Sequence, residues 1–435
     1  MVTSKKFLRQ VCILCAFLLA SLAFCACSES NTPPNPTTDS RSALEKYWSD
    51  DYAGEKGLIV RGSNMYLADK KFNAIALNCY DLLTQTYATN KIDDAYRLLE
   101  TLNKEKVPVI RFTVIGHGYK DYKIFFSAKE QYMNFLDQIC QKAEELHIGL
   151  IPSFFWLYNG LPDYLDQPIR SWADENSETA QFALSFTEEL VTMMKDYKSI
   201  WGYELGNEYN LDCDLPSENF LPPLPEGSVR VRSIEEDAFT SDDFNTVLNF
   251  WAKKVKSIDD SDRLLTSGNA ILRYNQYNLA ETRSWDVDTA EQKEKITKKM
   301  HPEYINTVSE HLYHFDDETN EYLIVENGKE IRQDFTQHIH LMSEICKKLN
   351  KVYFVGEFGY DRFTVFETNE RIMIMRKMSF AALEEDVPLM LIWNFSLGIL
   401  KTEVTFYPED DLTPLVFELI REINNEFEIK NAAAI

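Results

Sequence analysis

Eight short runs of apolar, β-branched or aromatic residues recur along this chain, separated by segments with helical periodicity. The helical segments include residues 92–106, and one more, 413–427, follows the last run. Regular strand–helix alternation is typical of a parallel sheet whose crossovers are helices. The runs span residues 72–80, 107–114, 148–156, 200–207, 263–269, 305–313, 352–359 and 388–396. Eight such units are the number that closes a (β/α)8 barrel.

A closed barrel is favoured over an open sheet, because the chain lacks the glycine-rich fingerprint of open dinucleotide-binding sheets. A length of 435 residues would by itself allow about three domains. A (β/α)8 barrel of this size forms one, and no second linker interrupts the pattern. We therefore predict the α/β class, with a single (β/α)8 TIM-barrel domain over residues 53–430 and a hairpin at 57–72 covering the barrel bottom.

The net charge of the chain argues against nucleic acid as a partner. The chain carries 45 Lys and Arg against 69 Asp and Glu, a formal net charge of -24. Such a surface repels phosphate backbones and anionic membranes, so nucleic acid is not an expected partner. The sequence also shows no phosphate-cradling glycine loop and no Cys or His cluster with zinc-ligand spacing.

The N-terminal residues have the character of a signal peptide. Lys5, Lys6 and Arg9 precede an apolar run over 11–27 that is too short for a confident membrane span. Its end, "FCAC", resembles a bacterial lipoprotein cleavage site with a small residue before Cys27. We expect residues 1–26 to be removed and Cys27 to carry a lipid. The site has phenylalanine where leucine is usual, so an ordinary secretory signal is the alternative.

The segment after Cys27 is polar, contains prolines and has no apolar period. It is predicted to be a flexible tether over residues 27–52. The expected location is the bacterial cell envelope, with the lipid anchor as the only membrane contact.

Four cysteines remain beyond Cys27, and the sequence predicts no disulfide between them. Cys140 and Cys346 occupy apolar positions of helical patterns, where a buried free thiol is the common state. The other two are Cys79 and Cys213.

Two carboxylates follow or end predicted strands. Glu208 comes directly after the fourth run, in "GNEYN", and Glu357 lies in the seventh, in "VGEFG". The C-terminal ends of barrel strands meet at one mouth. Two carboxylates there can flank a glycosidic bond, one protonating the leaving oxygen while the other attacks the anomeric carbon. The alternative is that each carboxylate caps a helix or pairs with a lysine.

Five motifs together strengthen the first interpretation, because the chain resembles glycoside hydrolase family 5 from about Gly57 to the end of the eighth run. The resemblance rests on the order in which the motifs occur on the strands. They are "VIRF" with Arg111, "GNEYN" with Asn207 and Glu208, "EHLYHF" with His311 and Tyr313, "VGEFG" with Glu357, and "LIWNF" with Trp393. Residues 61–83 also look like the first hairpin and strand of the β-mannanases of that family.

The resemblance implies a role for each of these residues. Glu208 is the implied acid/base and Glu357 the implied nucleophile. Arg111 and Tyr313 would keep Glu357 charged and aimed. The remaining implied contacts are to the sugar: Asn207 to its 2-hydroxyl, His311 to a hydroxyl or a neighbouring side chain, and Trp393 as an apolar floor. The alternatives are a core ion pair for Arg111 and core packing for Tyr313 and Trp393.

One position departs from the family pattern. Many members have a histidine at the end of the third strand, whereas this chain has Phe154, Phe155 and Trp156 there. A sugar contact is then missing or replaced, and we expect Trp156 to stack on a sugar ring instead. Trp172 and Trp285 also lie in or near strand-end loops and are further candidates for stacking.

The expected activity is that of a retaining O-glycosyl hydrolase, similar to an endo-β-mannanase or a cellulase. Its substrate would be a β-linked polysaccharide or oligosaccharide, with β-mannan first and β-glucan second. Retention requires the two carboxyl groups to lie about 5–5.5 Å apart, and the chemistry requires neither metal nor cofactor. A non-catalytic glycan-binding surface lipoprotein on the same barrel is the alternative. No oligomeric state is predicted.

Overall fold

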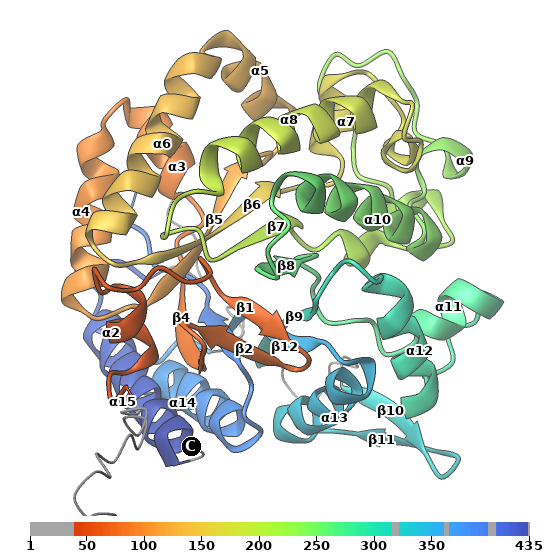
Figure 1. Cartoon of the computed structure of the whole chain (residues 1–435). Coiled ribbons are helices and arrows are strands. Elements are labelled where there is room, and N and C mark those ends of the chain that lie inside the picture. Colours follow the sequence, from red (N-terminus) through yellow and green to blue (C-terminus); the bar gives the residue numbers. More distant parts are fainter. Residues whose placement is uncertain (1–38, 315–321, 361–364, 399–405, 434–435) are drawn as a thin grey trace, which may run out of the picture. The chain divides into compact units, whose positions relative to one another are not determined.

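Eight strands form one sheet in the order β8-β7-β6-β5-β4-β13-β12-β9 (Figure 1). The computed structural model describes residues 39–314, 322–360, 365–398 and 406–433. All pairs in this sheet are parallel. The strands are β4 (Ala74–Asn78), β5 (Val109–Ile115), β6 (Gly149–Phe155), β7 (Gly202–Gly206), β8 (Leu264–Thr266), β9 (Thr307–His314), β12 (Val352–Tyr360) and β13 (Leu389–Ile392). Each lies within or over one of the eight predicted runs.

The first and last strands of this order, β8 and β9, are joined by side chains. The Asn306 amide donates to the Arg263 carbonyl at 3.0 Å, and its oxygen accepts from the Leu265 backbone N–H at 2.8 Å. The Thr307 hydroxyl donates to the Leu265 carbonyl at 3.2 Å. An asparagine side chain thus takes the place of a backbone ladder, and the sheet closes into the predicted (β/α)8 barrel.

Helices cover the outside of the barrel because each has one apolar face. In α4, Ala95, Leu98, Leu99 and Leu102 recur at helical spacing and are all buried. The helices between and after the strands are α3 (Leu82–Thr89), α4 (Ile92–Lys104), α5 (Tyr119–Ser127), α6 (Lys129–Glu145), α8 (Glu178–Met194), α10 (Ser241–Ile258), α12 (Ala290–Met300), α13 (Phe335–Leu349), α14 (Thr368–Glu384) and α15 (Leu412–Ala433).

Shorter elements decorate the loops. They are α7 (Gly160–Tyr164), α9 (Ile234–Asp237), α11 (Gln276–Thr282), the 3-10 turns η1 (Ile169–Ala173), η2 (Tyr209–Asp212) and η3 (Glu218–Phe220), and the hairpin of β10 (Leu323–Glu326) and β11 (Lys329–Arg332). Among the described helices, none is long and apolar enough to cross a membrane.

A small antiparallel sheet covers the bottom of the barrel, as predicted for residues 57–72. It consists of β1 (Ile59–Arg61), β2 (Asn64–Leu67) and β3 (Lys70–Lys71), and β1 and β2 lie over the barrel centre in Figure 1. The Leu58 N–H donates to the Trp201 carbonyl at 3.0 Å, and the Leu264 N–H donates to the Leu58 carbonyl at 2.7 Å. Because Trp201 and Leu264 lie where β7 and β8 begin, the opposite, C-terminal ends of the strands are left for a site.

Part of the predicted tether packs on this bottom face. Helix α2 (Ala43–Tyr47) is closed by a capping box between Ser42 and Glu45. Tyr47 is fully buried, and its hydroxyl donates to the Lys198 carbonyl at 2.6 Å. Trp48 stacks on Trp201 with ring centroids 6.3 Å apart. Residues 42–52 therefore belong to the folded body, since two aromatic rings anchor an otherwise polar stretch; residues 1–38 lie outside the described part of the chain.

The four described cysteines, Cys79, Cys140, Cys213 and Cys346, are free and buried. Burial raises the pKa of the Cys140 thiol well above its ordinary value. These thiols are therefore protonated packing groups, in line with the prediction of no disulfide between them.

Candidate active site

Glu208 is aimed by an unusual backbone conformation at the end of β7. It has φ 60° and ψ 25°, in the left-handed region, and its N–H donates to the Gly268 carbonyl at 2.8 Å. Gly268 itself has φ +72°, and a Cβ there would lie 1.8 Å from the Gly206 carbonyl oxygen. Only glycine fits this approach, which locks the loop after β8 against the base of Glu208. Non-glycine residues in this region are typical of functional sites.

Glu357 is aimed by a bulge in β12. The register of β12 against β9 shifts between Val355 and Glu357, and its register against β13 shifts between Val355 and Phe358. The Asn78 amide donates to the Gly356 carbonyl at 2.9 Å, which ties the bulge to β4. Bulges beside active sites redirect side chains, and here the bulge brings Glu357 beside His311 of β9.

Arg111 of β5 holds the site together from inside the barrel and is 0% exposed. Its guanidinium donates to Glu357 Oε1 at 2.8 Å, to Asn207 Oδ1 at 2.7 Å and to Asn78 Oδ1 at 3.0 Å. Its Nε donates to the Glu204 carboxylate at 2.8 and 2.9 Å. A cation fixed on four side chains is set within the site and orients both Glu357 and Asn207.

Two donors fix the Glu357 carboxylate. Arg111 occupies Oε1, and the Tyr313 hydroxyl donates to Oε2 at 2.7 Å. Burial raises the pKa of Glu357, whereas Arg111 and the Tyr313 hydroxyl oppose that rise by stabilising the charged form. With both oxygens accepting hydrogen bonds, the site is built for an aimed carboxylate.

Glu208 has a different environment. Burial raises its pKa to about 7, and the charge of Arg111 lowers it. Its hydrogen-bond partner is His311, whose Nδ1 lies 2.8 Å from Glu208 Oε1. A carboxyl group with this pKa holds a proton near neutral pH and can release it.

The protonation of His311 follows from its surroundings. Burial lowers its pKa to about 3, so the ring is neutral at neutral pH. Its Nε2 is buried and has no hydrogen-bond partner among the described residues. An N–H at Nε2 would leave a buried donor unpaired, so the proton belongs on Nδ1, where it is donated to Glu208 Oε1. The acid proton of Glu208 is then carried by Oε2.

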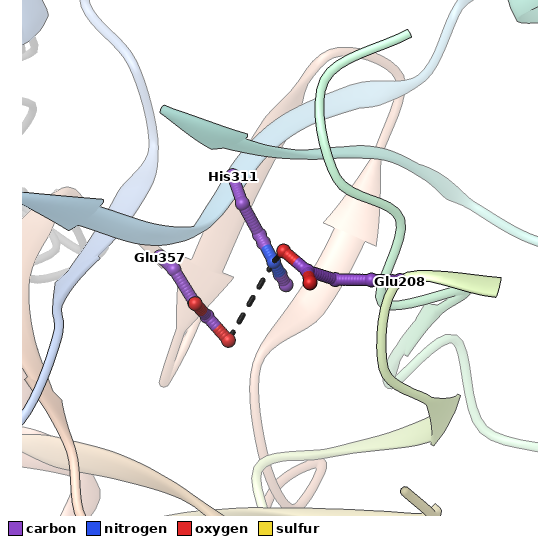
Figure 2. A group of neighbouring side chains, drawn as sticks. All are labelled: Glu208, His311 and Glu357. Atoms are coloured by element: carbon purple, nitrogen blue, oxygen red, sulfur yellow. Dashed lines mark hydrogen bonds and ion pairs between the residues drawn. The ribbon is translucent and has the colours of Figure 1, made fainter. Parts of the chain in front are cut away.

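The three side chains converge on one point (Figure 2). One ligand-type atom each from Glu208, His311 and Glu357 lies within 4.8 Å of the others. Such a group can in principle hold a metal ion. However, the guanidinium of Arg111 already lies 2.8 Å from Glu357 Oε1, and a bound cation would face that charge. The donor set therefore suits acid–base chemistry better than metal binding.

Aromatic rings surround these carboxylates. Trp156 lies over the Arg111 guanidinium at 4.7 Å and stacks with Trp393 at 6.0 Å, and Tyr80 stacks on Trp393 at 5.2 Å. Trp393 is partly exposed, but Trp156 is only 6% exposed. Trp393 thus exposes part of its ring beside the carboxylates, while most of Trp156 covers the arginine.

The other two tryptophans named as candidates for stacking, Trp172 and Trp285, differ in their exposure. Trp172 is fully buried, and its indole N–H donates to the Tyr158 carbonyl, so its predicted role in stacking on sugar is wrong. It lies in η1, which packs against α8 and α10. Trp285 is 49% exposed and lies 6.5 Å from the ring of Phe220.

The structure brings together every site residue predicted from the strand-end motifs, and it adds two that were missed. Asn78 ends β4, and Glu204 lies in the middle of β7 with 0% exposure. A signal for Glu204 was present. It is the charged residue of an otherwise apolar strand, and the period of two places it on the same face as Gly202 and Gly206.

No family model matches the chain, and no curated protein matches it. Solved structures do. The endo-1,4-β-mannanase from Rhizomucor miehei has a TM-score of 0.60 at 15% identity, covering 85% of this chain and 99% of that one. The endo-β-1,4-mannanase from Thermotoga petrophila has 0.53 at 16%, covering 82% and 77%. The β-1,4-D-mannanase from Cryptopygus antarcticus has 0.52 at 15%, covering 83% and 94%. At these identities the likeness establishes the fold, a (β/α)8 barrel of the kind found in glycoside hydrolase family 5.

Proposed function

We propose that this protein is a retaining glycoside hydrolase, with Glu357 as nucleophile and Glu208 as acid/base. The observation that carries the proposal is the contrast between the two carboxyl groups. Glu357 is held by Arg111 and Tyr313, while the pKa of Glu208 is raised to about 7. Burial raises the pKa of both carboxyl groups, but Arg111 and Tyr313 donate to Glu357 and stabilise its charged form, so Glu357 suits the role of nucleophile and Glu208 that of acid.

The distance between them supports retention over inversion. An oxygen of Glu208 and an oxygen of Glu357 lie within 4.8 Å of each other. Direct attack needs carboxyl groups about 5–5.5 Å apart, whereas an inverting water needs about 6.5–9.5 Å.

In the first step, a Glu357 oxygen attacks the anomeric carbon and the bond from that carbon to the glycosidic oxygen breaks. The Oε2 proton of Glu208 moves to the departing oxygen, leaving Glu208 charged and Glu357 esterified. Arg111 and Tyr313 keep the attacking carboxylate aimed. Asn207, itself held by Arg111 at 2.7 Å, would bond the sugar 2-hydroxyl, a contact that strengthens as charge develops on the ring.

In the second step, Glu208 removes a proton from water, and the water oxygen attacks the same carbon. The ester bond to Glu357 breaks and the carboxylate returns to Arg111 and Tyr313. Two inversions leave the anomeric configuration unchanged. Each proton and bond in this sequence is supplied by the two carboxyl groups, the sugar and water.

The proposed substrate is a β-linked polysaccharide or oligosaccharide, β-mannan first and β-glucan second. This choice is supported by the names of the three structural neighbours above and by the partly exposed ring of Trp393, which suits the apolar face of a pyranose.

The test is release of reducing ends from mannan, glucan and xylan, with the anomeric configuration of the first product followed by NMR. Retained configuration on mannan is expected. Binding of these polymers without any cleavage would favour the alternative, a glycan-binding protein, and inverted products would refute the assigned roles. We further propose that Cys27 anchors the protein in the cell envelope, as its cleavage-site-like sequence predicts.

A further inference from the structure

Glu204 has no place in the reaction steps above, although it contacts Arg111 through both of its carboxylate oxygens. It lies inside the barrel on β7, is 0% exposed, and accepts from Arg111 Nε with both oxygens. A second guanidinium nitrogen of Arg111 lies 2.8 Å from Glu204 Oε1. Gly268 packs directly against it, since a Cβ there would lie 2.8 Å from the Glu204 carboxyl carbon.

All three guanidinium nitrogens are therefore committed. Nε donates to Glu204, one terminal nitrogen donates to Asn78 and Glu357, and the other donates to Asn207 and lies 2.8 Å from Glu204 Oε1. The contact with Glu204 fixes the edge of the guanidinium that faces away from the reacting groups. Without it, the plane of Arg111 could turn, and Glu357 would turn with it.

The charges of the cluster do not balance. Arg111 is the cation that faces three carboxyl groups, Glu204, Glu357 and Glu208, while His311 is neutral. With Glu204 and Glu357 ionised the sum is already negative by one. That excess disfavours ionisation of Glu208.

The groups packed around Glu204 and Glu208 from the other elements change this balance little. Ser153 of β6 and Thr266 of β8 pair with Glu204 in register and carry no charge. Tyr209 and Tyr313 are phenols whose pKa burial raises well above the ordinary value. Asp212, beyond Glu208, is an acid whose pKa burial raises and the charge of Arg273 lowers, so this carboxyl group faces a cation of its own.

We propose that Glu204 is a positioning residue that holds Arg111 between two carboxylates and, by its own negative charge, sets the pH range in which Glu208 and Glu357 work. This inference rests on the proposed function for its kinetic readout only.

The test separates charge from position. Glu204→Gln keeps the size of the side chain and removes its negative charge. The positive charge of Arg111 is then no longer offset by Glu204, so it should lower the pKa of both Glu357 and Glu208. Both limbs of the pH–rate profile should move to lower pH, and the rate above the basic limb should fall about tenfold for each unit moved. Glu204→Asp keeps the charge and shortens the reach, so the profile should stay in place while kcat falls and KM changes little.

The matched control is Glu310→Gln. Glu310 is 1% exposed on β9 and is bonded to His338 at 2.9 Å and Tyr353 at 2.8 Å, without contact to Arg111. It is an equally buried carboxyl group, so its loss should leave the profile in place. A wild-type profile in Glu204→Gln, or an equal shift in Glu310→Gln, would overturn the proposal.

A second readout does not need turnover. Titration of 13C-labelled glutamate carboxyl groups by NMR in the folded wild type and Glu204→Gln should show the Glu357 and Glu208 signals titrating at lower pH in the variant. Unmoved titrations overturn the role of Glu204 even in an active enzyme. Moved titrations in a protein that cleaves no glycoside uphold it while refuting the proposed function.

Discussion

At the scale of single residues, Glu357 is the sharpest test of the proposed chemistry. Glu357→Gly removes the attacking group and should lower kcat by about 10³-fold or more, because no other described carboxylate is held by both Arg111 and Tyr313. Added azide should enter the vacated space, attack from the opposite face and restore part of the rate on an aryl glycoside. The product, followed by NMR, should be a glycosyl azide of inverted configuration. Absence of both rescue and this azide adduct would count against nucleophilic attack by Glu357.

Glu208 should respond differently, because its proposed task is to protonate the leaving oxygen. Glu208→Ala should cost about 10²- to 10⁴-fold on substrates with poor leaving groups and much less on activated aryl glycosides. The measurement is kcat/KM across leaving groups of graded acidity. Equal losses on all of them, for Glu208→Ala and Glu357→Gly alike, would contradict the separate roles.

The pH dependence follows from the same residue. Glu208 must be protonated to act as acid, and burial raises its pKa to about 7. Activity should therefore be retained below that value and fall as pH rises through about 7. This limb belongs to the profile of kcat/KM, which reports the free enzyme. A basic limb several units higher would show that another group supplies the proton.

The candidate site was largely predictable from sequence at this scale, because its residues stand at strand ends, where a barrel brings them to one mouth. The pairing of Glu204 with Arg111 and the tautomer of His311 were not predictable. Both depend on contacts across strands far apart in the chain, Arg111 with Glu204 and His311 with Glu208. The hydrophobic period and the sequence motifs predict on which face of a strand a residue lies, but they do not predict which side chains from other strands it contacts there.

At the scale of elements, the junction between β8 and β9 should be a weak point of the barrel. Asn306→Ala removes both amide bonds and leaves the buried Leu265 N–H without its partner, so it should lower the free energy of unfolding by about 2–4 kcal/mol. Asn249→Ala is the control, since within the described ranges the Asn249 amide bonds only to Asn245 of α10. Its cost should stay below about 1 kcal/mol. Urea denaturation measures both, and equal losses would mean that the junction is held by packing alone.

The elements themselves were predictable for a related reason. Buried parallel strands read as continuous apolar runs, and amphipathic helices such as α4 read by their period. Helix α2 was missed because its burial depends on Tyr47 and Trp48 meeting Trp201 far along the chain. The Asn306 junction was missed because this asparagine lies inside the predicted run 305–313, and an apolar run does not show which strand a polar side chain meets.

At the scale of the whole molecule, the proposed anchor is testable directly. Cys27→Ser removes the only proposed acceptor of the lipid, so the variant should appear in the soluble fraction while wild type stays with membranes. Activity on soluble substrate should be unchanged, since residue 27 precedes the folded body. Membrane association of Cys27→Ser equal to that of wild type would refute lipidation at this cysteine.

The attachment of α2 to the bottom of the barrel also determines at which end of the barrel the N-terminal segment joins the folded body. The chain enters the folded body at Ser42, beside the ends where β7 and β8 begin, whereas Glu208 and Glu357 lie toward the other end of the strands. A protein fixed to a bilayer through residues preceding Ser42 is thus held by its closed end. Its open end can then be presented outward, where polymers too long to slip between enzyme and lipid could still be reached.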